Sequence, residues 1–330
     1  MSLTAAMLIG RSALTASQLG IQVSGNNIAN VGTPGYNRQV AYLEPVGGAT
    51  YDVSSRSGRG VNVRDVRRQI DEALQNRLFN GVADEAAASQ QLQTLSSLEA
   101  TLGELSGNDF TTQLQSFFNV WSERANLSKS SSVVVQQATK IAEFLRRTRS
   151  DVAALRTQID KQLASGAEQA NELLSSISKL NLQIANTEAG QGVANSLRDQ
   201  RDQAVSELSM LVDLTVIDQP NGSVNILIGS TPVILAGATR GLKLELVDNN
   251  GTLEASLKTT DNGETLPVQS GTLGALLSDR KASVDQTAAA LDSVASQLIF
   301  QVNKLHSTGT NKDGLTSAIG SLAFATADRT

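Results

Sequence analysis

Side chains that could carry acid–base or metal chemistry are few in this 330-residue sequence. Histidine occurs once, at His306, and cysteine is absent. A histidine that acts as a general base or binds a metal needs carboxylate, imidazole or thiolate partners, and the sequence places no such group of partners beside His306. We therefore expect His306 to be a surface or helix-end residue, and we predict neither a metal site nor a cofactor.

A second candidate is the run Arg-Asp-Gln-Arg-Asp at 198–202, which could suggest a paired acid and base. On a helix, opposite charges three or four residues apart form ion pairs at the surface. We therefore expect a solvated, salt-bridged face at 198–202. The same explanation is expected to hold for Asp71 and Arg77.

Two further patterns, a pair of glycines and a group of aromatic residues, are better explained by structure than by ligand binding. Gly58 and Gly60 lack the strand-to-helix context and the Gly-Lys-Ser/Thr ending of a phosphate-binding loop. Trp121 lies near Phe117 and Phe118 at helical spacing, which predicts a packing cluster rather than the wall of a ligand site. Because aromatic residues make up only 3% of the chain and titratable groups do not cluster, we predict that the protein is not an enzyme.

Net charge and hydropathy exclude other classes of partner. The formal net charge is -5, so no general attraction to nucleic acid or to an anionic membrane surface is expected. No stretch approaches the roughly 20 apolar residues that span a bilayer, so membrane insertion is not expected. The first residues lack the basic run of a cleavable signal peptide, and export would need another route.

The elements that position these residues begin with an amphipathic helix over 3–28. Its apolar stripe recurs at alternating steps of four and three residues. The stripe consists of Leu3, Met7, Gly10, Leu14, Ser17, Ile21, Ser24 and Ile28. Small residues lie between them and permit close packing of helices. Because little of its own chain lies nearby to cover the stripe, this helix would be marginal alone in water.

Long helices are predicted for much of the remaining chain. Apolar spacing of three and four indicates helix from Val66 to about Leu105, at 110–123, through 138–211 and from Val284 to Leu305. The clearest heptads begin at Ala138. These rods must bury their stripes against one another.

Extended structure is predicted in two places. Short alternating runs at 40–66 indicate a hairpin or loop after the Pro34 turn. Between 213 and 270, short β-branched runs alternate with Asn, Gly and Pro, which is typical of antiparallel strands.

The predicted fold is therefore mainly α with a smaller β part: long amphipathic helical rods, forming a coiled coil or bundle, and a small antiparallel β-rich domain. The predicted parts are an N-terminal assembly helix and elbow at 1–40, a long helical-bundle domain at 41–212, the β-rich domain at 213–270, a return helix of the bundle at 271–306 and a loop-like tail at 307–330.

The most specific pattern is Asn-Asn-Ile-Ala-Asn-Val-Gly-Thr-Pro-Gly-Tyr-Asn-Arg-Gln at 26–39. It closely resembles the N-terminal signature shared by flagellar rod, hook and hook-associated proteins. The signature residues are Asn26, Asn27, Asn30, Thr33, Pro34, Gly35, Tyr36, Arg38 and Gln39. Because Pro34 cannot continue a helix and Gly35 has wide backbone freedom, we expect an elbow between an inner helix and an outer body.

Three other segments extend the resemblance. Residues 58–71 look like the next element of the same axial-protein family, in which a glycine-rich turn leads into a helix. The segments at 195–202 and 271–280 are similar to stretches typical of the hook-associated proteins that join hook to filament. The resemblance covers most of the chain.

The resemblance implies a structural protein of the bacterial flagellum, outside the cell at the hook–filament junction, exported by the flagellar type III apparatus without a cleavable signal peptide. It implies assembly contacts through the apolar residues of the first helix, which are Leu3, Met7, Leu14, Ile21 and Ile28. The implied partners are copies of the chain, the flagellar hook protein and a second hook-associated junction protein. Family members continue to a C-terminal helix, so we expect a truncated chain that lacks the region usually recognised by an export chaperone.

Three alternatives stay open at this point. Another hook or rod axial protein would share residues 26–77 but lack the heptad rods at 138–211. A secreted coiled-coil adhesin or binding module would use the β-rich domain at 213–270 to bind its ligand. A peptidoglycan hydrolase would need a carboxylate or histidine pocket, which the sequence does not indicate.

Overall fold

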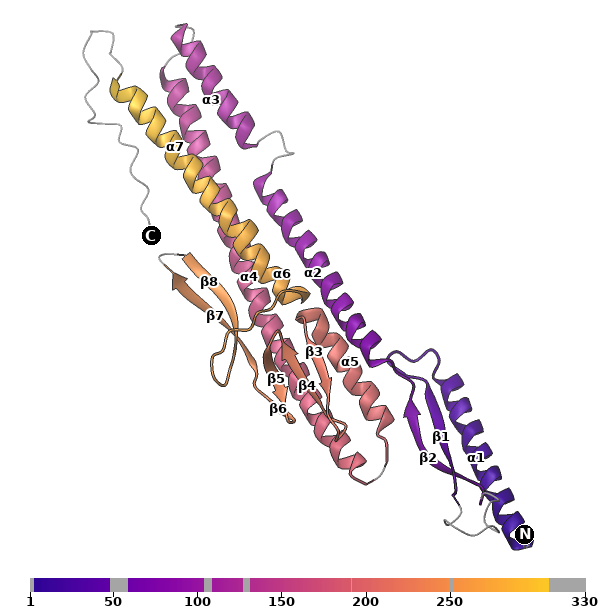
Figure 1. The fold of residues 1–330 in the computed structure, drawn as a ribbon. Helices are drawn as coiled ribbons and strands as arrows, with labels where there is room; N and C mark the ends of the chain where they lie inside the picture. The colour runs from indigo at the N-terminus through magenta and orange to yellow at the C-terminus, as the bar shows by residue number, and fades with distance from the viewer. Residues whose placement is uncertain are drawn as a thin grey trace. The chain divides into compact units, whose positions relative to one another are not determined.

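The computed structural model describes residues 3–47, 59–103, 109–126, 131–190, 192–249 and 252–308. Long helices dominate, and short antiparallel sheets make up the β part (Figure 1). The predicted class, mainly α with a smaller β part, is confirmed. The chain divides into two compact units, which are residues 1–88 with 164–275 and residues 89–163 with 276–330. The domain boundaries derived from the sequence stay a prediction.

The N-terminal part of the first unit is a helix packed on a β-hairpin. Helix α1 (Leu3–Ala29) is followed by strands β1 (Gln39–Pro45) and β2 (Val61–Arg68). The strands pair antiparallel, with Gln39 opposite Arg68, and both strands contact α1. The predicted helix and the predicted extended segment are confirmed, while the middle of the segment, including Gly58, lies outside the described residues.

Helix α2 (Glu72–Leu102) begins later than the sequence predicts. Val66 was expected to open this helix, but it lies in β2 and pairs with Ala41. Asp71 provides the physical reason, because its Oδ1 accepts a hydrogen bond from the Leu74 amide at 3.0 Å and so caps the first turn. Asp71 and Arg77 are both exposed, as expected for a solvated face, and the carboxylate of Asp71 bonds to backbone.

The rods predicted at 138–211 are confirmed as two helices, α4 (Ser131–Glu188) and α5 (Asn195–Leu211). In the first unit, the buried side of α4 contains Leu174, Ile177 and Ile184, and α5 contributes Leu208. These side chains are fully removed from solvent, and they form the helical side of the core.

The predicted β-rich segment is also confirmed, as two antiparallel sheets. The first has the order β3 (Thr215–Asp218), β4 (Val224–Ile228), β5 (Thr231–Leu235) and β6 (Ala238–Thr239). The second is a hairpin of β7 (Leu242–Asn249) and β8 (Thr252–Thr259). Alternate residues of β4 are buried, as expected for a strand with one face on a core.

Two asparagines of α4 hold the first residues of two strands. Asn181 is fully buried, and its amide exchanges hydrogen bonds with the backbone of Val224 at 2.9 and 3.0 Å. Asn171 does the same with Leu242 at 2.8 and 2.7 Å. Each side chain satisfies backbone groups at a strand start that would otherwise be unpaired.

The second unit contains a three-helix core. Helix α3 (Phe110–Ala125), the first half of α4 and helix α7 (Gln286–Thr308) supply the side chains around Phe117, Ile141 and Leu145. The predicted aromatic cluster forms around Phe117, whose ring packs edge-on against Phe118 and Trp121 at 5.6 and 6.2 Å between centroids. Of the three, Phe117 is buried, whereas Phe118 and Trp121 stay exposed.

The expectations for His306 and for the tail at 307–330 concern residues that the structure describes only in part. His306 falls near the end of α7, but its side chain lies outside the described residues. The loop-like tail expected at 307–330 also lies outside them beyond Thr308.

Helix α6 (Gly271–Asp279) starts with a glycine that no other residue can replace without strain. Gly271 has φ +77°, and a Cβ atom there would lie 2.5 Å from the carbonyl carbon and oxygen of Leu211. The start of α6 therefore touches the backbone at the end of α5, which explains a glycine at the head of the 271–280 motif.

We predict that Gly271→Ala lowers the free energy of unfolding by at least about 3 kcal/mol, because backbone strain adds to a clash with backbone atoms. Gly263→Ala is the matched control, since Gly263 has a similar φ of +71° but open space around it. That change should cost about 1–2 kcal/mol. Urea unfolding followed by circular dichroism measures both, and equal losses would show that the contact with Leu211 contributes nothing.

A buried polar group follows at the end of α6, before the π-helical turn η2 (Arg280–Asp285). Asp279 is 1% exposed, and within the described part of the chain its Oδ2 has no hydrogen-bond partner. Burial raises the pKa of Asp279, although Gln91 donates a hydrogen bond to Oδ1 at 3.4 Å. The neighbouring Arg280 is instead paired with Asp160 at 2.6 Å.

We predict that Asp279→Asn raises the free energy of unfolding at pH 7, by on the order of 1 kcal/mol, because a charge no longer has to be buried. The folded-state pKa is raised, so the wild type regains this stability as pH falls through that pKa toward the ordinary value of 3.8. The difference between the two proteins should therefore shrink with acidity.

Asp285→Asn serves as the control for that comparison. Asp285 pairs with Arg156 at 3.0 Å, so its neutralisation should destabilise the protein. Denaturant titrations at several pH values test the opposite signs, and a destabilised Asp279→Asn variant would contradict the argument.

Candidate assembly surface

Helix α1 presents its large apolar side chains to solvent. The five residues predicted to make assembly contacts have exposed fractions between 68 and 77%, and they are Leu3, Met7, Leu14, Ile21 and Ile28. Only Ala16 of this helix is buried. A row of exposed leucine, isoleucine and methionine side chains is typical of a surface that binds a partner.

The opposite side of α1 is held by the hairpin. The Ser12 hydroxyl donates to the Ile9 carbonyl at 2.8 Å and accepts from the Val61 amide at 3.2 Å. Gly60, with φ +104°, faces Ser12 so closely that a Cβ would collide with the hydroxyl. The hairpin thus occupies one side of α1 and leaves the apolar stripe uncovered.

Asn27 closes the elbow between α1 and β1. Its Nδ2 donates to the Gln39 carbonyl at 2.8 Å, and its Oδ1 accepts from the Gln39 amide at 2.9 Å. The Tyr36 hydroxyl donates to the same Oδ1 at 2.8 Å. Burial, followed by the negative charge of Asp199, raises the pKa of Tyr36, so this hydroxyl stays protonated and remains a donor.

The other signature residues form the turn itself. Asn30 donates from Nδ2 to the backbone and side chain of Asn26, both at 2.9 Å, and Thr33 donates to Asn30 at 3.3 Å. Gly35 has φ +75°, in the region that favours glycine. Pro34 precedes it in the turn, and the Arg38 carbonyl accepts from the Gln69 amide at 2.8 Å.

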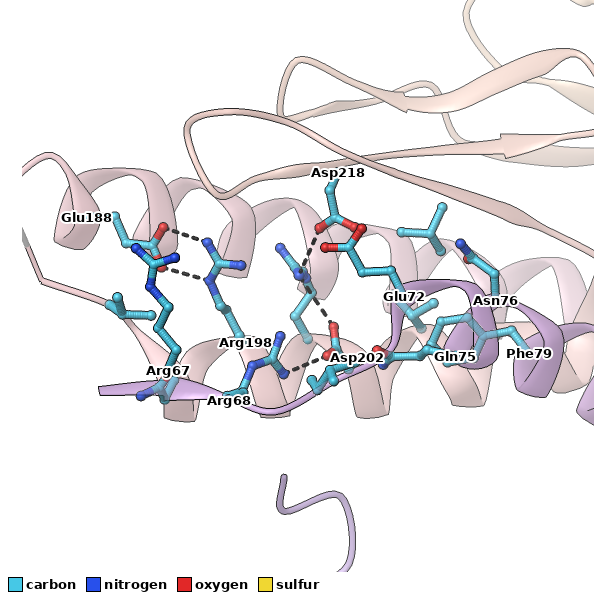
Figure 2. Close-up of a pocket in the computed structure, with 16 residues that line it drawn as sticks. Arg67, Arg68, Glu72, Gln75, Asn76, Phe79, Glu188, Arg198, Asp202 and Asp218 are labelled. Atoms are coloured by element: carbon cyan, nitrogen blue, oxygen red, sulfur yellow. Dashed lines mark hydrogen bonds and ion pairs between the residues drawn. The ribbon is translucent and has the colours of Figure 1, made fainter. Parts of the chain in front are cut away.

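A buried ion-pair cluster joins the hairpin to α5. Arg68 at the end of β2 donates from Nη1 to Asp199 at 2.9 Å. The same Nη1 donates to Asp202 at 2.6 Å (Figure 2). Asn37 adds a hydrogen bond to Asp199 at 2.8 Å, and Asn195 donates to the Val66 carbonyl at 2.7 Å. We call Arg68, Asn37, Asn195, Asp199 and Asp202 the hairpin anchor.

The anchor corrects the prediction of a solvated face at 198–202. The side chains of Arg68, Asp199 and Asp202 are only 9, 12 and 14% exposed, because the hairpin covers this side of α5. Arg201 is 2% exposed and donates to the Gly222 carbonyl at 2.8 Å. Burial lowers the pKa of Arg201, and the nearby carboxylates only partly oppose that effect.

A second ion pair lies beside the anchor. Arg198 donates from Nε and Nη2 to the two carboxylate oxygens of Glu188, each at 2.7 Å. Burial alone would raise the pKa of Glu188, but hydrogen bonds from Arg198 and from the Ala194 amide outweigh it and lower the pKa. Glu188 therefore stays ionised, and it ties the end of α4 to α5.

Arg68, Asp202, Arg198 and Glu188 line part of a cavity of about 390 Å³, and half of the residues around this cavity are arginines and carboxylates (Figure 2). The arginines of this lining are paired with acids, so the site holds chain segments together. In the described residues, no cluster of three or more histidine, aspartate or glutamate side chains is placed to hold a metal ion. None of the described helices has the length and apolar character needed to cross a membrane.

The sequence reasoning singled out segments 26–39, 58–71 and 195–202 but did not predict that they meet. One local signal was available, because Asn195, Asp199 and Asp202 recur at steps of four and three and so share one face of α5. When a row of polar side chains lies next to the buried apolar side of a helix, it indicates that a polar segment from elsewhere in the chain packs on that row.

We predict that Arg68→Ala lowers the free energy of unfolding by about 3–5 kcal/mol, because it leaves two poorly solvated carboxylates without a counter-charge. Arg64→Ala on the same strand is the control. Arg64 pairs with Glu44 at 2.6 Å, but both side chains are more than half exposed, and such pairs contribute about 0–1 kcal/mol. Urea unfolding of both variants is the measurement, and equal losses would contradict the proposed role of the anchor.

Comparison with known proteins gives two family matches. A family model described as the flagellar hook-associated protein FlgK helical domain matches residues 95–321. A model described as flagella basal body rod protein matches residues 7–37, which include most of α1 and most of the signature motif.

Individual relatives and one solved structure are similar to this chain and carry the same family name as the helical-domain match. Flagellar hook-associated protein 1 of Escherichia coli is 29% identical over 318 residues, covering 92% of this chain and 57% of the relative. The protein of the same name from Bacillus subtilis is 30% identical over 269 residues, covering 78% and 50%. The structure of the flagellar hook junction protein FlgK from Burkholderia pseudomallei has a TM-score of 0.59 and 26% identity, covering 72% of this chain and 44% of that one. The chain spans about half the length of these curated relatives.

Proposed function

The chain belongs to the family of flagellar hook-associated protein FlgK, and from this premise we propose that it is a structural component of the flagellum at the junction of hook and filament. The family resemblance drawn from the sequence motifs is confirmed. The observation that carries the proposal is the apolar stripe of α1, which is exposed on a helix whose other side is firmly held.

Burial of this stripe between subunits supplies the driving force for assembly. At about 25 cal/mol per Å² of apolar surface, burying the five large side chains gives on the order of 10 kcal/mol before ordering costs. The hairpin reduces those ordering costs, because α1 is already fixed along one side. The match of residues 7–37 to a rod-protein family supports the same role, since it covers this helix.

The elbow and the hairpin anchor determine the direction in which α1 is presented within its unit. Asn27 fixes α1 relative to β1 through its paired hydrogen bonds with Gln39. Arg68 fixes β2 relative to α5 through two carboxylates. In a tube of repeated subunits, a small angular error at this point would accumulate from one subunit to the next, so a rigid connection serves assembly.

The proposed partners are further copies of the chain, the flagellar hook protein and a second hook-associated junction protein. The names of the relatives, which place them with the hook and its junction, support this proposal. The proposed route out of the cell is the flagellar export apparatus. A chain without cysteine and with 3% aromatic residues forms no disulfides and carries little bulk through a narrow channel.

We predict that Leu14→Asp together with Ile21→Asp abolishes incorporation into the flagellum, because two charges would lie in the buried contact. The isolated variant should keep its helical circular dichroism spectrum, since both side chains are exposed within the chain. Thr15→Asp together with Gln22→Asp is the matched control, because it adds the same two negative charges to exposed residues that lie about 80–100° around the helix from Leu14 and Ile21.

The measurement uses cells that depend on the variant chain, scored by swimming motility and by electron microscopy of attached filaments. The control should swim as the wild type does. Normal filaments in cells carrying the Leu14 and Ile21 double variant would overturn the proposed function.

A further inference from the structure

Asparagine followed by glycine is a reactive pair, because glycine has no side chain to shield its amide nitrogen from the neighbouring carboxamide. The sequence contains four such pairs, which begin at Asn80, Asn221, Asn250 and Asn262. The structure describes three of them: Asn80 lies in α2, and Asn221 and Asn262 lie in turns. The three pairs share their chemistry and differ in surroundings, so the fold determines which of them reacts.

The carboxamide of Asn262 is held over the next peptide in the turn that follows β8. Its Oδ1 accepts a hydrogen bond from the Glu264 amide, two residues on, at 3.2 Å. This Asx turn brings the Asn262 Cγ close to the Gly263 nitrogen. The Thr259 hydroxyl also donates to Oδ1, and Thr259 is fully buried. Two donors therefore point at the oxygen that becomes negative when Cγ is attacked.

Gly263 leaves the attacking nitrogen accessible. It has φ +71°, and no atom beyond the neighbouring residues lies within 4 Å of the place that a Cβ would take. Asn262 is exposed and Gly263 is partly exposed, so water and hydroxide can reach the pair.

We propose that Asn262 is a site of spontaneous deamidation, in which the Gly263 nitrogen attacks the Asn262 side chain. Hydroxide removes the proton from this nitrogen, which forms a bond to Cγ. The Cγ–Nδ2 bond then breaks, and the leaving nitrogen takes a proton from water and departs as ammonia. Water opens the resulting five-membered imide at either carbonyl carbon and leaves aspartate or isoaspartate. The net reaction is hydrolysis of a carboxamide, so it needs only water.

Asn221 is a close comparison within the same chain. Its Oδ1 also accepts two hydrogen bonds, from the Ser223 amide at 3.1 Å and from the Ser223 hydroxyl at 2.7 Å. Gly222 is buried, however, and a Cβ there would collide with the carboxylate of Glu188. Hydroxide therefore has poor access to the Gly222 nitrogen, and this pair should react more slowly than the pair at Asn262.

Asn80 is the second comparison. It is exposed, but it lies inside α2, where backbone angles are helical and amide groups belong to the hydrogen-bonded ladder. The Gly81 nitrogen can attack only after this part of the helix has opened, and such opening costs free energy.

The reaction changes the turn that closes β8. It adds a negative charge beside Asp261 and Glu264, which already share Arg240 at 2.9 and 3.7 Å. Isoaspartate also lengthens the backbone by one methylene between Thr259 and Glu264, whose amide and carbonyl pair at 2.9 Å. The modified turn is therefore less well paired. The reaction occurs within one chain, so it does not depend on the proposed role in the flagellum.

The test is to incubate the full chain in warm, mildly alkaline buffer and to measure deamidation by mass spectrometry of tryptic peptides. Trypsin places the three asparagines in separate peptides, at 78–124, 202–240 and 259–280. Asn262 should react at least about tenfold faster than Asn221 and Asn80, which corresponds to about 1.4 kcal/mol in the barrier. A rate at Asn262 no higher than at Asn80 would overturn the proposal.

The variant Thr259→Val removes the buried hydroxyl, and Thr259→Ser is the matched control that keeps it. Deamidation at Asn262 should slow about fivefold in the valine variant, which converts to about 1 kcal/mol in the barrier. The serine variant should react at close to the wild-type rate. An unchanged or faster rate at Asn262 in the valine variant would contradict the role given to the hydroxyl, since loosening of the turn would then outweigh loss of the donor.

Discussion

The arrangement of the first unit depends on the contact between Arg68 and the two aspartates of α5. Taking a guanidinium and two carboxylates out of water costs several kcal/mol per charge, and only close, well-directed hydrogen bonds offset that cost. Arg68 meets this condition at 2.9 and 2.6 Å, and Asn37 adds a third bond to Asp199. The hairpin, and with it the helix that it carries, therefore has one strongly preferred position on α5.

Because the hairpin is held on α5, the exposed apolar stripe of α1 is held in place before it meets a partner. An apolar helix that moved freely would lose much of its binding free energy to ordering when it met a partner. Here one side of α1 is fixed through Ser12 and the elbow is closed through Asn27, while the stripe from Leu3 to Ile28 stays exposed. On one side of α1 the polar groups are hydrogen-bonded to the hairpin, and on the other side the apolar side chains are exposed. Such a helix suits a subunit that buries its apolar side chains only in an assembly.

Polar residues in otherwise apolar rods have a similar positioning role elsewhere in the unit. Asn181 and Asn171 interrupt the heptads of α4, yet each pairs with the backbone at the start of a strand. They determine where the sheets attach to the helix. Asp279 differs, because burial raises its pKa and its second oxygen has no partner among the described residues.

The sequence by itself determined the features that follow from local periodicity and turn chemistry. These include α1, the Pro34 elbow, the rods of α4 and α5, and the antiparallel strands after Val212. Tertiary structure alone decided that Val66 pairs in a strand, that the charges at 198–202 are buried, and that three separated motifs meet. The physical reason is that spacing shows which residues share a face, whereas burial depends on which distant segment covers that face.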